Sequence, residues 1–337
     1  MFSVVIPNYN GQEFLFGCLN SILSASGSLA AEIIVVDNGS TDGSVGYLKS
    51  QSSKVKSTSQ KLKVIFNKKN LGFAKAVNQG ILAAKNEFVA LINNDLKIER
   101  NWFAEIEKAI RVRQRKERIA TYCGKVLNWD GTKIESAGLF YWLKGKAFNR
   151  GNDQSIKTDH YRKEEFVFGA PASAVVYCKP AIVEAGLFDE DFFAYEEDVD
   201  LALRLANNRW KTLYLPGAIS YHLGGGTSKE MGSFRQRMDF KNWWFIIIKN
   251  YPLSVIIKNG PAILIERARN LSGLIKAVVW CQVPSAVLSV FGELLIKLPK
   301  IIGKRKPVNK EILFQDSENR GPPAGGELKA NQTVFYP

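Results

Sequence analysis

The sequence contains little cysteine and histidine: four cysteines and two histidines among 337 residues. The cysteines form no CxxC pair, which argues against a zinc ribbon or a disulfide framework and favours a reducing cytosol. They are Cys18, Cys123, Cys178 and Cys281. The chain opens directly into an apolar run, FSVVIP, without the basic region and cleavage site of a signal peptide. We therefore expect no secretory signal.

Two phosphate-binding patterns are also missing. No GxGxxG follows the first apolar run, and no GxxxxGK[ST] occurs anywhere in the chain. In both patterns a glycine-rich loop lets the backbone approach phosphate groups closely. Their absence weakens an interpretation as a dinucleotide-binding or P-loop protein.

Acidic residues are the minority among the charged residues. The chain has 46 Lys and Arg against 32 Asp and Glu, a formal net charge of +14. This excess indicates an anionic partner, either nucleic acid, a phosphorylated substrate or an acidic membrane surface. The hydrophobic content of 46% is typical of a globular protein and fits one large α/β domain with an appendage, or two domains.

Apolar runs alternate with helical patterns over the first hundred residues. We expect strands at 2–6, 32–37, 63–66 and 87–92, and a helix from about 73 to 85. This alternation predicts a doubly wound, mostly parallel sheet. Beyond about residue 101 the pattern is less regular, and the expected elements are a strand at 166–177, a helix entered through acids at 188–205 and a strand at 211–222.

A polar cluster follows each of the first four strands. The clusters are Pro7–Gly11, Asp37–Asp42, Asn67–Gly72 and Asn93–Asp95. Any one of them is explained equally well by an ordinary turn. Because ligands of such sheets bind at the carboxyl ends of the strands, four clusters together favour a binding site there.

Three adjacent acids, 196–198, follow the aromatic stretch FFAY and precede an apolar helical pattern. The dipole at a helix start stabilises acids and explains the cluster without any chemistry. The side chains of Phe192, Phe193 and Tyr195 would lower the local dielectric and raise the pKa of one acid, which suits a general base. Both interpretations stay open.

His222 follows the last expected strand and precedes a glycine-rich loop, 224–226. A single histidine at a strand end is more often structural than a ligand. Together with Asp95, which also follows a strand, it could complete a divalent-metal site, since Mn²⁺ accepts both oxygen and imidazole ligands.

Seven motifs then stand out along the chain: VVIPNYNG, IIVVDNGSTDGS, NLGFAKAVNQG, NND, GAPASAVVY, FFAYEEDVDLALRL and YHLGGGTS. They resemble, in order and spacing, the motifs of family 2 glycosyltransferases of the GT-A fold, over roughly residues 2–250. Within that family the chain is most similar to bacterial rhamnosyltransferase-like and galactofuranosyltransferase-like enzymes. These enzymes build O-antigen, capsule or cell-wall polysaccharide on lipid-linked acceptors.

The resemblance implies a nucleotide-sugar pocket and a metal. The residues implied to bind the nucleoside-diphosphate sugar are Pro7, Asn10, Asp37, Asn70, Gly72, Phe73, Asn93 and Asn94. Asp95, at the place of the family's DxD motif, would bind the Mn²⁺ or Mg²⁺ that bridges the diphosphate, with His222 as a second ligand. The first acid of DxD is replaced by Asn93, which implies weaker metal binding without the nucleotide.

The resemblance also implies the acceptor side of the site. Gly169, Ala170 and Glu197 would border the acceptor, and Asp198 would be the base that deprotonates its hydroxyl group. One base and one metal suit a direct inverting displacement. A retaining reaction with Glu197 as nucleophile stays open. The resemblance favours dTDP-rhamnose as the donor, and UDP-galactose next.

The C-terminal part has a different texture. Residues 277–296 approach the length of a membrane span, but Gln282, Pro284 and Glu293 interrupt them. We expect amphipathic helices on an anionic membrane surface, with the protein peripheral on the inner face of the cell membrane; packing on the catalytic domain or a homo-oligomer interface is the alternative. The proposed anchors are Trp243, Trp244 and Trp280, and the basic cluster is Lys297, Lys300, Lys304, Arg305, Lys306 and Lys310.

These patterns divide the chain into three expected regions. Residues 1–238 form the catalytic domain, with a nucleotide-sugar half at about 1–100 and an acceptor half at about 101–238. Residues 239–310 form the helical amphipathic region, and 311–337 a polar, disordered tail. Alternatives are a nucleotidyltransferase, a catalytically inactive scaffold suggested by Asn93, and a nucleic-acid-binding protein. The last is disfavoured because no nucleic-acid-binding motif accompanies the charge.

Overall fold

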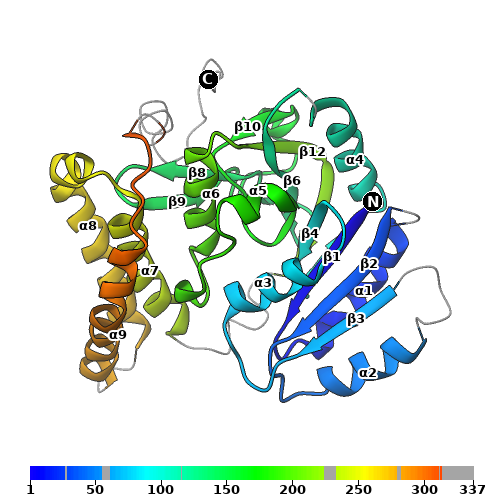
Figure 1. The fold of residues 1–337 in the computed structure, drawn as a ribbon, viewed down its shortest axis with the longest axis horizontal. Coiled ribbons are helices and arrows are strands. Elements are labelled where there is room, and N and C mark those ends of the chain that lie inside the picture. Colours follow the sequence, from blue (N-terminus) through cyan, green and yellow to red (C-terminus); the bar gives the residue numbers. More distant parts are fainter. Residues whose placement is uncertain are drawn as a thin grey trace.

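The computed structural model describes residues 1–26, 29–54, 61–114, 116–223, 233–278, 282–310 and 312. Figure 1 shows an α/β body with three C-terminal helices packed at one end, on the side away from β3 and α2. The expected glycine-rich loop at 224–226, Trp280, Cys281 and the expected tail from 313 onward lie outside the described residues.

One mixed sheet runs through the body in the order β10-β12-β6-β11-β4-β1-β2-β3. Its first strands are β1 (Phe2–Asn8), β2 (Ala30–Asp37), β3 (Lys61–Phe66) and β4 (Phe88–Ile92), which pair in parallel. In this register Asn8 lies opposite Asp37, and Asp37 opposite Phe66. The polar clusters that follow these strands therefore meet at one edge of the sheet, as expected.

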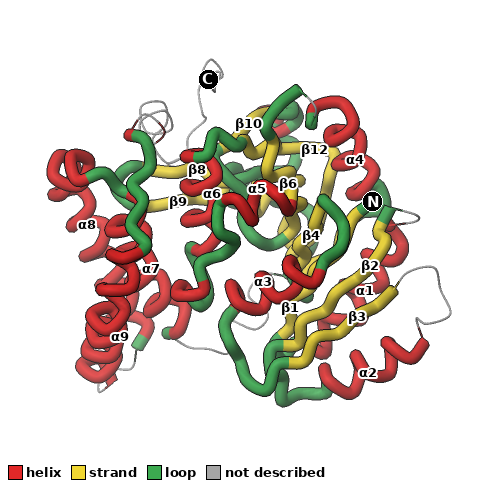
Figure 2. The backbone as a smooth tube through the Cα atoms, viewed as in Figure 1, coloured by secondary structure: helices red, strands yellow, loops and turns green. Residues whose placement is uncertain are grey.

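Alternate residues of the strands face two separate cores, and helices lie on both faces of the sheet (Figure 2). Val4 and Ile6 pack with α1 (Gln12–Ser26), α2 (Ser44–Lys54) and α4 (Trp102–Arg113), whereas Val5 packs on the opposite face. That second face is covered by α3 (Phe73–Ala83), α5 (Lys179–Glu184) and α6 (Glu197–Asn207). Helices on both faces of a largely parallel sheet confirm the doubly wound architecture.

The second half contributes antiparallel strands to the same sheet. Its strands are β5 (Leu96–Ile98), β6 (Ile119–Asn128), β7 (Ile134–Ser136), β10 (Glu165–Val167), β11 (Ala174–Cys178) and β12 (Lys211–His222), and a hairpin of β8 (Leu139–Trp142) and β9 (Lys146–Asn149) forms a separate sheet. β11 runs antiparallel to both β4 and β6, while β12 is parallel to β6. Two short 3₁₀ turns, η2 (Asp159–Tyr161) and η3 (Glu190–Phe192), complete these connections.

Two sequence predictions in this half are wrong. The single strand expected at 166–177 is two strands, β10 and β11, joined by a loop. At Gly169 in this loop an added Cβ would lie 2.6 Å from the Cβ of Ala202, so only glycine allows α6 to pack so closely. The helix expected at 188–205 begins at Glu197, because Phe193, Tyr195 and Glu196 adopt the left-handed conformation with φ of 67°, 67° and 64°.

The C-terminal region forms three helices, α7 (Phe234–Asn250), α8 (Leu253–Ala277) and α9 (Val283–Gly303), as expected for a helical extension. They pack on the body through a third apolar cluster that includes Tyr141, Phe192 and Phe245. Trp243 lies inside this cluster and is 2% exposed, so it is not the interfacial anchor that the sequence suggested. No helix in the described part of the chain is long and apolar enough to cross a membrane.

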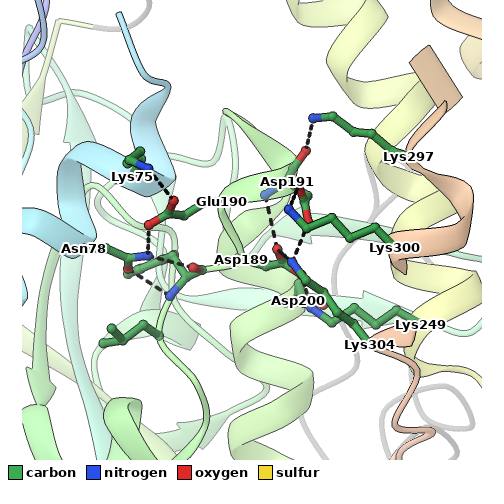
Figure 3. Close-up of polar contacts among 12 residues, drawn as sticks. Lys75, Asn78, Asp189, Glu190, Asp191, Asp200, Lys249, Lys297, Lys300 and Lys304 are labelled. Atoms are coloured by element: carbon green, nitrogen blue, oxygen red, sulfur yellow. Dashed lines mark hydrogen bonds and ion pairs between the residues drawn. The ribbon is translucent and has the colours of Figure 1, made fainter. Parts of the chain in front are cut away.

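The predicted role of the basic cluster as a group of lipid-facing side chains is also largely wrong. Lys300 and Lys304 form ion pairs with Asp191, and Lys304 also pairs with Asp189. The ammonium of Lys297 donates to the backbone oxygen of Asp191 at 2.9 Å. Figure 3 shows these side chains reaching from α9 to the acids of the body. The cluster therefore attaches α9 to the segment that precedes α6.

Candidate active site

The ends of β1, β2 and β4 are joined by side-chain hydrogen bonds. The Asn8 Nδ2 donates to Asp37 Oδ2 at 2.9 Å, and the Asn94 Nδ2 donates to Asn8 Oδ1 at 2.7 Å. All three side chains are buried. Asn8 was missed by the sequence analysis, although it lies within the first polar cluster. It connects two residues that the sequence assigned to nucleotide binding.

The loops after β1 and β2 also hold each other. Asp37 Oδ1 accepts from the Ser40 N–H at 3.1 Å, and Asn10 Oδ1 accepts from the Thr41 N–H at 2.8 Å. Pro7 is buried at the end of β1. These contacts shape the edge at which a ligand would bind, and the binding roles of Pro7, Asn10 and Asp37 stay predictions.

The loop before α3 touches the segment that carries the acids. The Asn38 Nδ2 donates to Asn70 Oδ1 at 2.9 Å and to the Gly72 carbonyl at 3.1 Å, which fixes this loop against β2. Gly72 has φ 90°, and a Cβ there would lie 2.7 Å from the Phe193 carbonyl oxygen. Phe73 packs on the neighbouring core. The predicted nucleotide loop and the predicted catalytic segment are thus in direct contact.

A histidine–carboxylate cluster lies where β4 and β12 end. The His222 Nε2 is 3.3 Å from Asp95 Oδ1, and its Nδ1 is 2.7 Å from Glu135 Oε1. β7 supplies Glu135, and β12 pairs with β5, so that Leu96 lies opposite His222. The structure therefore brings together the two residues predicted to bind metal. Glu135 is a further member that the sequence analysis missed.

The surroundings of His222 favour positive charge. Burial lowers its pKa, but the hydrogen bonds and charges of Asp95 and Glu135 outweigh burial and raise the pKa to about 10. A Glu135 carboxylate on Nδ1 also orients the ring and leaves Nε2 directed at Asp95. A carboxylate behind the imidazole is the usual support of a metal-binding histidine.

This corner fits a divalent metal that also has ligands from a substrate. Adjacent ligands of an octahedral ion at about 2.1 Å lie about 3.0 Å apart, close to the 3.3 Å between Asp95 Oδ1 and His222 Nε2. The Asn93 Oδ1 is buried and has no hydrogen-bond partner among the described residues, so an acceptor is left for an incoming group. Within the described ranges no three His, Cys, Asp or Glu side chains could hold an ion by themselves.

The acid cluster lies at the start of α6. Asp198 Oδ2 accepts from the Ala172 N–H at 3.1 Å, and Asp198 Oδ1 accepts from the Val199 N–H at 2.8 Å. Glu197 is 4% exposed, and its Oε2 is buried without a hydrogen-bond partner in the described part of the chain. One acid is therefore held by two backbone donors, while its neighbour is not.

Burial raises the pKa of all three acids in the cluster, the direction expected from the aromatic surroundings. For Asp198 the two backbone hydrogen bonds oppose this effect. For Glu197 burial and then the Asp198 charge hold the pKa well above its usual range. The pKa of Glu197 is thus held up by burial and by the neighbouring charge, whereas two backbone donors counteract the effect of burial on Asp198.

A short strap, Ala172 and Ser173, connects the acid cluster to the histidine–carboxylate cluster. Ala172, which donates to Asp198, is followed by Ser173, whose carbonyl accepts the Asn93 N–H at 2.8 Å. Gly169 and Ala170, the predicted acceptor border, lie just before this strap and are buried. The loop between β10 and β11 thus joins Asn93 and Asp198, whose motifs are more than a hundred positions apart in the sequence.

The arrangement of the elements defines a class by its fold: an α/β protein whose mixed sheet has helices on both faces and a helical C-terminal extension, as in the GT-A fold. The model of glycosyl transferase family 2 matches residues 3–162. The chain therefore carries a family 2 glycosyltransferase domain.

Curated relatives agree with this assignment. Glycosyltransferase GlyG of Streptococcus pneumoniae is 29% identical over 149 residues, which cover 44% of this chain and 45% of that protein. N-acetylglucosaminyl-diphospho-decaprenol L-rhamnosyltransferase of Mycobacterium tuberculosis is 26% identical, covering 62% of this chain and 73% of that protein. The match to GlyG spans less than half of that relative's length.

A solved structure shows the same fold. GalNAc-T7, crystallised with UDP, GalNAc and Mn²⁺, superimposes with a TM-score of 0.58 at 18% identity, covering 75% of this chain and 48% of that chain. At this identity the likeness concerns the fold alone.

Proposed function

We propose that the protein transfers a sugar from a nucleoside-diphosphate sugar to a lipid-linked or polysaccharide acceptor in cell-envelope polysaccharide synthesis, with inversion. The observation that carries this proposal is the strap at Ala172 and Ser173, which connects the acid pair to the carboxylate–histidine corner. A base and a diphosphate-binding corner at one site are what glycosyl transfer requires.

Asp198 acts as the base. Its two oxygens each accept one backbone N–H, which orients the carboxylate and leaves lone pairs for the acceptor hydroxyl. As the acceptor oxygen bonds to the anomeric carbon, the bond from that carbon to the diphosphate breaks and the hydroxyl proton moves to Asp198. Burial and the Asp198 charge raise the pKa of Glu197, which disfavours a second negative charge beside the base.

Asp95 and His222 would hold Mn²⁺ or Mg²⁺, and the ion would take the place of the proton on Nε2 of His222. The ion would neutralise charge on the leaving diphosphate. Glu135 fixes the His222 ring, and Asn93 offers its buried Oδ1 to a donor group of the ligand. Since the described part of the chain supplies two direct ligands, ion and nucleotide are expected to bind together.

The proposed donor is dTDP-rhamnose, with UDP-galactose second. Support comes from the relative named as a rhamnosyltransferase acting on a decaprenol-linked diphosphate. A lipid-linked acceptor would lie at a membrane, which agrees with the exposed surface of α8 and α9.

Both helices expose apolar side chains. At 100° per residue, Leu253, Ile257, Leu264 and Ile275 of α8 fall within about 40° of one another, and all four are exposed. On α9 the exposed apolar side chains are Leu288, Phe291, Leu295, Ile296 and Ile302.

These two faces carry no exposed, unpaired acid. The acids of α8 and α9 are Glu266, which is 2% exposed, and Glu293, which pairs with Lys241 at 2.7 Å. Arg269 and Lys276 are exposed on α8. An exposed apolar face on a helix whose exposed charges are basic fits an anionic lipid surface, so we propose peripheral attachment through α8 and α9, at the inner face of the cell membrane.

Flotation with phosphatidylcholine–phosphatidylglycerol vesicles tests this attachment. We expect the full chain to float and the Ile257→Glu/Leu288→Glu double variant to stay in the soluble fraction. Leu82→Glu is the control, because Leu82 is 61% exposed on α3, away from these helices. Equal flotation of the double variant and wild type would refute the assignment. A wild-type dimer without vesicle binding would indicate a homo-oligomer interface instead.

A panel of nucleotide sugars tests the proposed reaction. Binding and hydrolysis are measured with Mn²⁺ or Mg²⁺ for the dTDP, UDP and GDP sugars, followed by transfer to a lipid-linked acceptor. We expect one donor to bind only in the presence of metal, and Asp95→Ala to lose that binding in calorimetry. Metal-independent binding, or unchanged binding by Asp95→Ala, would reject the metal assignment.

A further inference from the structure

The segment before the acid pair has a strained backbone. Phe193, Tyr195 and Glu196 all have positive φ within four positions, directly before Glu197. Each such residue costs of the order of 1–3 kcal/mol and persists only where the surroundings enforce it. The question is which contacts hold this turn in place.

One buried amide contacts most of the turn. Asn242 of α7 is 0% exposed, and its Nδ2 lies 3.1 Å from the Phe192 oxygen, 2.8 Å from the Ala194 oxygen and 2.7 Å from the Tyr195 oxygen. Its own Oδ1 is buried without a hydrogen-bond partner among the described residues. An unsatisfied buried acceptor is costly. The hydrogen bonds from Nδ2 to the three carbonyls must therefore stabilise this orientation of the amide.

A buried lysine of α7 links the two ends of this segment through ion pairs. The Lys249 ammonium, seven positions further along α7, lies 2.7 Å from Asp189 Oδ2 and 2.8 Å from Asp200 Oδ2. Asp189 precedes the strained turn and Asp200 follows the acid pair. Figure 3 shows this ammonium between the two carboxylates, with the lysines of α9 on Asp189 and Asp191.

The opposite side of the turn rests on the predicted nucleotide loop. The Phe193 carbonyl accepts the Ala74 N–H of α3 at 3.2 Å. Gly72, just before, has no side chain that would strike Phe193. The turn is therefore held between α3 of the body and α7 of the C-terminal region.

We propose that Asn242 is a positioning residue for glycosyl transfer: its amide holds the turn at 192–195 and thereby places Glu197 and Asp198. Asn242 of α7 then helps to position the two acids, in addition to the membrane attachment proposed for α8 and α9. This inference rests on the proposed function for its catalytic part, while the contact between Asn242 and the turn stands independently.

The test compares Asn242→Leu, which removes the donors at similar volume, with Ile246→Ala. Ile246 is a 0% exposed residue of the same helix that packs in the apolar cluster, so its truncation lowers stability without removing a hydrogen bond to the turn. Asn242→Ala is the second variant if Asn242→Leu does not fold. Each folded variant is measured by hydrogen exchange, by calorimetry with UDP and dTDP plus Mn²⁺, and by transfer kinetics.

We expect Asn242→Leu to speed amide exchange in peptides covering 189–200 and to lower kcat by about a hundredfold, since a 1 Å misplacement has that effect. Donor KM and nucleotide affinity should change less than about threefold, because the substitution should weaken the transition state and not the binding of the substrate. Ile246→Ala should lower the melting temperature but retain the wild-type kcat and the wild-type exchange at 189–200.

The outcomes separate the two proposals. Unchanged exchange at 189–200 in Asn242→Leu would overturn the contact, whatever the activity. Faster exchange with unchanged kcat would overturn its catalytic role. A wild-type chain that transfers no sugar from any donor would reject the proposed function, while the exchange experiment would still decide whether Asn242 holds the turn.

Discussion

Asp198 shows how a short stretch of backbone determines the role of a side chain. Two N–H groups hold its carboxylate, whereas Glu197 beside it is buried and has an oxygen without a partner. Two adjacent acids of similar chemistry thus have different hydrogen-bonding surroundings, which oppose the burial-induced rise in pKa at Asp198.

The first prediction concerns this residue. Asp198→Asn should lower transfer by at least about a hundredfold, the usual contribution of a general base, while binding of the nucleotide survives. Burial raises the pKa of Asp198, so the base is ionised only above a pH higher than the ordinary aspartate value of about 3.9. In the wild type, kcat/KM should therefore fall as the pH decreases through that raised pKa. Substantial turnover by Asp198→Asn would remove it as the base.

Glu135 is the member of the histidine–carboxylate cluster that the sequence analysis missed. It is 87 positions from His222 and belongs to no motif. Glu135→Gln should weaken Mn²⁺-dependent nucleotide binding by about ten- to a hundredfold, as loss of a carboxylate behind a metal-binding histidine does. Glu117→Gln is the matched control, since Glu117 pairs with Arg113 at a similar exposure. Equal affinities of the two variants in calorimetry would contradict the assignment.

At the scale of elements, the loop before α3 depends on a single glycine. Gly72 combines φ 90° with a contact at which a Cβ would meet Phe193. Gly72→Ala should destabilise the protein by more than about 1 kcal/mol in denaturant unfolding, because alanine is strained at positive φ. Gly46→Ala, at a position of α2 with open space, should be neutral or stabilising by about 0.5–1 kcal/mol. The same sign for both variants would contradict this account.

At the scale of the whole molecule, buried ion pairs attach the C-terminal helices. Lys249 and Asp189 are 6% and 5% exposed at the side chain, whereas Lys300 is 63% exposed. Lys249→Met should cost about 3 kcal/mol, the lower end for breaking a buried ion pair, because Asp189 keeps Lys304 and Asp200 keeps Arg204 as partners. Lys300→Met should cost at most about 1 kcal/mol, as exposed pairs do. Thermal and denaturant unfolding of both variants measure this difference, and equal losses would show that burial does not decide it.

Much of the structure of about residues 1–100 could be predicted from the sequence because the signals in this part of the chain are local. Apolar runs and the polar clusters after them place the strand ends, and a parallel sheet brings such ends to one edge. The prediction of one strand at 166–177 was wrong because the apolar pattern continues through the loop around Gly169. This loop approaches α6 closely, and the sequence does not show that approach. The lipid-facing roles predicted for Trp243 and the lysines of α9 were wrong, because composition alone does not say whether a side chain faces lipid or the body.

By itself, the sequence determined the doubly wound fold, the family resemblance and the motifs that carry Asp95, Asp198 and His222. Only the tertiary structure decided that Glu135 supports His222, that Asn8 joins Asp37 to Asn94, and that Asn242 contacts the strained turn. The physical reason is that such contacts depend on strand register and helix packing between distant segments. Local propensity and periodicity contain no information on which buried polar groups meet.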